Sequence, residues 1–136
     1  MSERPTGSIH QERILPATPA EVYGAFTDAE RHAAFTGAPA TFEPKVGGTF
    51  TAWGDYIEGS NLELVPGEKL VQHWSTAEWP EGAPPSVLEL TFEADPGGTK
   101  VTLNQTEIPA EQVEAYRQGW IDHYWLPLEK YFGAGS

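Results

Sequence analysis

Residues 109–132 read PAEQVEAYRQGWIDHYWLPLEKYF, and this stretch decides the fold. Its apolar residues recur at steps of three and four, which is the spacing of one face of an α-helix. The residues of that face are Val113, Tyr116, Trp120, Tyr124, Leu128 and Tyr131. The spacing predicts one long helix, roughly 36 Å at 1.5 Å per residue, whose aromatic face must be buried. Pro127 is expected to kink the last turn, because its ring clashes with a carbonyl one turn earlier.

The chain before this helix alternates apolar and polar side chains, a period of two that is typical of β-strands. The clearest strand is 86–94, where Leu88, Leu90 and Phe92 share one face. Further strands are predicted at 49–53, 56–65, 69–74 and 100–105. Glycine-containing turns separate these runs, so we expect them to pair in antiparallel order as a meander.

The N-terminal part predicts one strand and two short helices. The strand is expected at 9–15. Thr18 can cap the first helix with Pro19 in its first turn, and Glu21 can complete a capping box. Asp28 is expected to cap the second helix, which Gly37 ends. We therefore predict one domain over 9–132, with short tails at 1–8 and 133–136.

Together these elements predict an α+β fold in which a curved antiparallel sheet surrounds the long C-terminal helix. A twisted sheet curls, so a straight helix leaves space against its middle, and that space is the expected cavity. Aromatic walls with a few polar tips are typical of a small-molecule site. The residues expected to line it are Phe35, Trp53, Trp74, Leu90, Trp120 and Tyr124.

The composition excludes several classes of function. Twenty acidic against eight basic residues give a net charge of −12, so nucleic acid and anionic membranes are poor partners. The chain has no cysteine, which excludes disulfides and thiolate metal sites. No segment has the apolar length of a membrane span or signal peptide, so we expect a cytoplasmic protein without membrane insertion.

No catalytic, metal or cofactor site is predicted. No two of His10, His32, His73 and His123 have the i, i+4 spacing that places two ligands on one helical face. The glycine pairs at 47–48 and 97–98 precede strands, whereas a phosphate-binding loop leads into a helix. With this many acidic residues, chance alone accounts for any pairing among Glu78, Glu81 and Glu89.

Several motifs together resemble the START-like, helix-grip superfamily, and within it the Activator of Hsp90 ATPase homologue 1-like C-terminal domain family. The motifs are Pro19-Ala20-Glu21-Val22-Tyr23, Val46-Gly47-Gly48-Thr49-Phe50, Leu62-Glu63-Leu64-Val65-Pro66, Trp79-Pro80-Glu81-Gly82 and Gly119-Trp120. The likeness spans about residues 9–132. It implies the helix-grip fold, an Hsp90-type chaperone as a partner and a role in the stress response.

Three functions follow from these patterns. The first is a non-enzymatic carrier or sensor of a small apolar ligand, such as a lipid, sterol, polyketide or flavonoid. The second, from the resemblance alone, is a protein-interaction module that regulates an Hsp90-type ATPase in the manner of a cochaperone. The third is a small-molecule cyclase or hydrolase. The sequence leaves these alternatives and the oligomeric state open.

Overall fold

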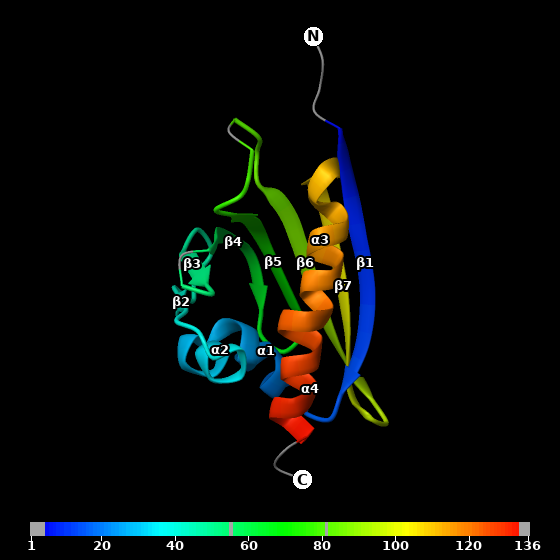
Figure 1. The fold of residues 1–136 in the computed structure, drawn as a ribbon. Helices are drawn as coiled ribbons and strands as arrows, with labels where there is room; N and C mark the ends of the chain where they lie inside the picture. Colours follow the sequence, from blue (N-terminus) through cyan, green and yellow to red (C-terminus); the bar gives the residue numbers. More distant parts are fainter. Residues whose placement is uncertain (1–4, 55, 81, 134–136) are drawn as a thin grey trace.

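The computed structural model describes residues 5–54, 56–80 and 82–133, and it has the α+β helix-grip architecture expected from the sequence (Figure 1). The strands are β1 (Thr6–Leu15), β2 (Thr41–Phe42), β3 (Thr49–Ala52), β4 (Ile57–Val65), β5 (Lys69–Thr76), β6 (Ser86–Asp95) and β7 (Gly98–Pro109). The helical elements are α1 (Pro19–Thr27), α2 (Ala29–Thr36), η1 (Ala110–Gln112), α3 (Val113–Trp120), η2 (Ile121–Trp125) and α4 (Leu126–Gly133).

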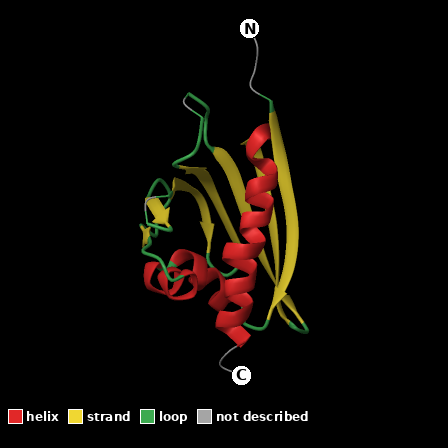
Figure 2. Ribbon diagram, in the orientation of Figure 1, coloured by secondary structure: helices red, strands yellow, loops and turns green. Residues whose placement is uncertain are grey.

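One antiparallel sheet has the strand order β1-β7-β6-β5-β4-β3-β2. The predicted meander, β3 to β7, is therefore confirmed; β2 adds an unpredicted strand at one edge, and β1 closes the other edge by pairing with β7. The sheet curves around the C-terminal helical run, which lies across its inner face (Figures 1 and 2). Helices α1 and α2 pack beside the end of that run, at the lower end of the view in Figure 1.

The N-terminal caps are those predicted. The Thr18 side chain accepts from the Glu21 N–H, and the Glu21 carboxylate accepts from the Thr18 N–H at 3.0 Å. Asp28 accepts from two backbone N–H groups at the start of α2. Gly37 ends α2 in the left-handed conformation at φ 79°, where a side chain would be strained.

Several boundaries differ from the prediction. Strand β1 begins at Thr6, because pairing with β7 extends to Pro109 and carries the chain beyond the weak apolar alternation that starts at Ile9. Residues 6–8 are therefore strand and not tail, whereas residues 1–4 and 134–136 lie outside the described part. Strand β4 begins at Ile57. A bulge between Asn61 and Glu63 interrupts its period of two.

The C-terminal helix accommodates Pro127 through a π-helical segment, η2, in the preceding turn. In η2 the Leu126 N–H bonds to the Ile121 carbonyl five residues earlier. This wider turn precedes a residue that lacks an N–H, the type of place where such segments occur. It also changes the helical phase, so that Tyr124 and Trp125 are both buried. The regular spacing predicted Tyr124 on the buried face and missed Trp125, which is fully buried.

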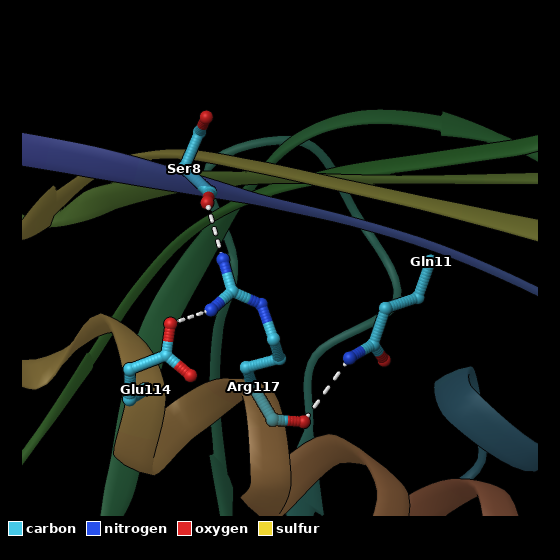
Figure 3. Close-up of polar contacts among 4 residues, drawn as sticks. All are labelled: Ser8, Gln11, Glu114 and Arg117. Atoms are coloured by element: carbon cyan, nitrogen blue, oxygen red, sulfur yellow. Dashed lines mark hydrogen bonds and ion pairs between the residues drawn. The ribbon is translucent and has the colours of Figure 1, made fainter.

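Gln11 of β1 joins the helix to the sheet at this irregular turn (Figure 3). The Ile121 N–H bonds to Gln118 O, whereas a regular helix would direct it to the Arg117 carbonyl. Gln11 Nε2 donates to Arg117 O at 3.1 Å. Gln11 Oε1 accepts from the Trp125 indole N–H. The Gln11 amide therefore provides hydrogen-bond partners for both a backbone carbonyl of the irregular turn and the indole N–H of a buried tryptophan.

We predict that Gln11→Leu lowers the free energy of unfolding by about 1–3 kcal/mol, because it leaves the Trp125 N–H and the Arg117 carbonyl without their partner. Urea unfolding followed by tryptophan fluorescence measures this change. The control is Glu12→Leu on the exposed side of the same strand, which should change stability by no more than about 0.5 kcal/mol. Equal losses in the two variants would contradict the role given to Gln11.

Candidate functional site

A cavity of about 480 Å³ lies between the C-terminal helical run and strands β3 to β5. Its lining residues are Trp53, Tyr56, Ile57, Trp74, Glu78, Glu111, Gln112, Ala115, Tyr116, Gly119, Trp120, His123 and Tyr124. Buried aromatic side chains, which we call the aromatic floor, form its inner part: Trp74, Tyr116, Trp120 and Tyr124. Exposed residues surround its opening, and we call these the rim: Tyr56, Glu78, Glu111, Ala115 and His123.

The rings of the aromatic floor stand at several angles to one another. The Trp74 ring lies 5.7 Å from that of Trp120 at 33° and 5.3 Å from that of Tyr116 at 84°. The Trp120 and Tyr124 rings are 4.7 Å apart at 46°. At these distances the rings are in contact with one another, so they form one continuous aromatic surface along the cavity.

A buried chain of hydrogen bonds fixes the Trp120 and Trp74 part of the floor. The Trp120 indole N–H donates to Gln105 Oε1 at 2.8 Å. Gln105 Nε2 donates to Ser86 Oγ at 3.0 Å, and the Ser86 hydroxyl donates to the Trp74 carbonyl at 2.7 Å. Gln105 and Ser86 are completely buried, so each of these polar groups depends on its neighbours in the chain.

A second set of polar contacts orders one side of the opening. The Tyr56 hydroxyl donates to the Glu78 carboxylate, and burial followed by this hydrogen bond raises the pKa of Tyr56 to about 12. The Tyr116 hydroxyl lies 2.6 Å from Thr76 Oγ1 and donates to Gln112 Oε1 at 3.2 Å. Gln112 Nε2 donates to the Glu78 carbonyl at 2.7 Å. The helix start and the end of β5 are thereby held together.

Trp53 forms the opposite wall in an unusual backbone conformation. Its φ of 53° is in the left-handed region, which a bulky side chain rarely adopts. The indole contacts the His123 ring edge-to-face at 5.2 Å. Its Nε1 is buried and has no hydrogen-bond partner within the described part of the chain. Strain and an unpaired donor together at one residue are features that occur at functional sites.

The hydroxyl of Tyr124 is anchored behind the cavity by His32. His32 Nε2 lies 3.0 Å from Tyr124 Oη, and both residues are buried. Burial lowers the pKa of His32 to about 4, against a smaller opposing effect of the Phe26 backbone. Burial raises the pKa of the Tyr124 hydroxyl. At neutral pH His32 is therefore uncharged and shares one hydrogen bond with the Tyr124 hydroxyl.

Four of the six residues expected to line a cavity do so: Trp53, Trp74, Trp120 and Tyr124. Phe35 lies outside it, because α2 directs this ring between Tyr124, at 5.8 Å, and Tyr131, at 6.2 Å. Leu90 also lies outside, in the middle of β6, where it pairs with Leu70 and Leu103 in the solid part of the core.

The sequence interpretation missed the rim. Of the rim residues, His123 lies three positions after Trp120, so the helical spacing alone places it on the cavity side, as it does the lining residues Gln112 and Gly119. Tyr56 and Glu78 had no such signal, because they lie at strand ends and only the folded sheet brings them to the helix. His73 points away from the cavity, as predicted from its place beside the buried Trp74.

The described residues bear on the metal and carboxylate sites considered from the sequence. No group of three His, Asp or Glu side chains in the described residues could hold a metal ion. Of the carboxylates considered from the sequence, Glu89 pairs with Lys69 at 3.3 Å, Glu78 lies at the rim, and Glu81 is outside the described residues. None of the described helices has the length and apolar character to cross a membrane.

Comparison with known families accounts for the fold. A family model described as Activator of Hsp90 ATPase homolog 1-like protein matches residues 16–133. The chain belongs to this family. The human protein named Activator of 90 kDa heat shock protein ATPase homolog 1 is 36% identical over 132 residues, which is 97% of this chain and 39% of the human protein. A Dictyostelium discoideum homologue is 36% identical over 116 residues, 85% of this chain and 30% of that protein.

Solved structures of other proteins have the same architecture. A crystal structure of an HSP90 activator from Plasmodium falciparum superposes with a TM-score of 0.81 at 26% identity, covering 94% of this chain and 96% of that one. A Mesorhizobium loti protein superposes at 0.79 with 23% identity, covering 96% and 99%. The chain spans about two fifths of the length of the human and mouse activators it matches.

We predict that stability falls between pH 6.5 and pH 4 partly through His32. The unfolded histidine has a pKa near 6.5 and the folded one a pKa of about 4, so the unfolded chain binds the extra proton in this window. Above pH 6.5 His32 is neutral in both states and costs no stability. As the pH falls from 6.5 to 4, protonation of the unfolded chain lowers the free energy of unfolding by up to about 3 kcal/mol. Urea unfolding at pH 7 and pH 4 measures the loss.

The matched variant for this test is His32→Gln, which keeps an acceptor for the Tyr124 hydroxyl but does not titrate. Its stability should fall less than that of the original chain over the same pH range. The loss of stability that remains in the variant between pH 7 and pH 4 comes from protonation of carboxylates. Parallel losses in the two proteins would contradict the assignment to His32.

Proposed function

We propose that this protein is a cochaperone-like interaction module that stimulates an Hsp90-type ATPase. The observation that supports the proposal is the match to named activators in both sequence and fold, 36% identity across 97% of the chain and a TM-score of 0.81. The matched region is one part of the longer curated relatives. The proposed activity is therefore that of this domain acting on the chaperone, in the cytoplasm expected from the sequence.

The surface offers two apolar regions for such a partner. Val46 and Leu62 are 65% and 39% exposed, and the Gly47 N–H bond to Asn61 O at 2.8 Å brings their two segments together. Leu126 and Tyr131 of α4 are 53% and 39% exposed. A partner protein can bury exposed apolar side chains such as these. Val46, Leu62 and Leu126 are exposed and can be replaced without opening the core, whereas Tyr131 also packs against the buried Phe35.

We predict that the purified chain raises the ATPase rate of the Hsp90-type chaperone from the same organism, with saturation as its concentration increases. A coupled ATPase assay measures the rate of ATP hydrolysis. An inhibitor of the chaperone's ATP site shows what fraction of that hydrolysis is due to the chaperone. One of the variants Val46→Ser/Leu62→Ser and Leu126→Ser should lose stimulation while keeping its melting temperature. An unchanged rate with the original chain removes the proposal.

The cavity supports a second candidate function, the binding of a small apolar ligand. A volume of about 480 Å³ is within the range of small-molecule sites, and most of the inner lining is aromatic. Gly119 contributes to this space. A Cβ at this position would have only His123 Cδ2 within 4 Å, at 4.0 Å, so the missing side chain leaves room beside the floor.

We predict that Gly119→Leu fills the cavity and abolishes ligand-induced stabilisation, whereas Gly119→Ala keeps it. Both variants should fold, because glycine inside a helix costs about 1 kcal/mol relative to alanine. Thermal unfolding with sterols, flavonoids and small aromatic compounds measures the stabilisation. If no compound raises the melting temperature of the original chain, this second function fails. Stimulation of the chaperone should be the same with Gly119→Leu, which separates the two candidates.

A further inference from the structure

We propose that the cavity binds a small organic cation, a compact quaternary or tertiary ammonium compound with an apolar body. This inference rests on the ligand-binding function above and adds the sign of the ligand's charge. The aromatic floor receives the cation, and the carboxylates of the rim face its charge.

The aromatic floor has the composition and geometry that recognise such cations. A cation over the face of an aromatic ring is attracted by the ring quadrupole, most strongly for tryptophan. Trp74 and Trp120 lie side by side at 5.7 Å, and the Tyr116 ring stands nearly perpendicular to Trp74. Trp53 adds a third indole from the opposite wall. A compact ammonium group in the cavity would contact the parts of these rings that line it.

The charged groups of the lining are acidic. Glu78 and Glu111 both line the opening, and the lining contains no lysine or arginine within the described residues. The Tyr56 hydroxyl donates to the Glu78 carboxylate and holds it in place. A carboxylate that is already oriented needs no rearrangement to face a cation at the opening. An anionic ligand such as a fatty acid would meet repulsion there.

The basic residue of α3 is directed away from this opening. Arg117 contacts the Glu114 carboxylate and reaches the Ser8 carbonyl of β1 at 3.5 Å (Figure 3). Its charge therefore lies on the β1 side of the helix and not in the cavity. The net charge of −12 adds a field that attracts cations to the whole molecule. The charge at the cavity opening and the net charge of the protein are thus both negative.

The experiment compares three soluble compounds of similar shape and different charge: 4-hydroxyphenyltrimethylammonium, 4-tert-butylphenol and 4-hydroxybenzenesulfonate. Two-dimensional NMR of the 15N-labelled chain follows the tryptophan indole signals as each is added. We expect the ammonium compound to bind at least about tenfold more tightly than the neutral phenol, from several ring contacts and the carboxylates. The sulfonate should produce no saturable shift.

Two variants assign the preference. Glu78→Gln/Glu111→Gln should weaken binding of the ammonium compound about threefold or more and leave the phenol unchanged. The control Glu30→Gln/Glu129→Gln makes the same charge change at exposed positions outside the cavity lining and should leave both compounds unchanged. Trp53→Leu should weaken binding of the ammonium compound more than binding of the phenol, because leucine keeps an apolar wall but removes the aromatic ring.

The outcomes separate this inference from the function on which it rests. Equal affinity for ammonium and phenol overturns the cation preference and leaves an apolar ligand site. If Glu78→Gln/Glu111→Gln and the control Glu30→Gln/Glu129→Gln weaken binding of the ammonium compound equally, the rim carboxylates have no specific role. Absence of any shift with all three compounds, in a chain whose spectrum is folded, removes both the cation site and binding of small aromatic ligands in this cavity.

Discussion

The structure depends on one constraint: the long C-terminal helix buries aromatic side chains whose polar tips must each find a partner. Four such tips bond to four different elements, β7, β1, α2 and β5. The pairs are Trp120 with Gln105, Trp125 with Gln11, Tyr124 with His32 and Tyr116 with Thr76. Apolar contact alone would allow the helix to slide or rotate on the sheet. Directional bonds to four elements fix its position, because moving the helix would leave several buried donors unsatisfied.

The same constraint explains the irregular turn before Pro127. A proline in the helix removes one N–H and crowds a carbonyl, and the π segment η2 absorbs this disturbance. The change of phase turns Trp125 toward β1, where Gln11 bonds both to its indole and to the Arg117 carbonyl. The irregular turn of the helix is thus one of the places where hydrogen bonds join the helix to the sheet.

The cavity lies where the helix and the sheet do not meet. The floor is rigid, because Gln105 and His32 hold its rings from behind, whereas the opening is made by the ends of strands and by the first turns of the helix. Gly119 keeps this space open on the helix side. The outer surface, with its exposed apolar pairs, is physically separate from the interior. A chaperone partner outside and a small ligand inside are therefore compatible in one domain.

The sequence by itself determined the elements, the caps, the meander and the family resemblance, because periodicity and turn residues act over a few positions. It also placed Trp74, Trp120 and Tyr124 in one cavity, since each faces inward by its period. It did not place Trp125, whose burial depends on a π segment that interrupts the regular helix. Only the tertiary structure decided that Tyr56 and Glu78 form the opening, that Phe35 and Leu90 lie outside it, and that His32 is buried. These placements depend on which strand ends, loops and helices meet across the sheet, and no short-range pattern contains that information.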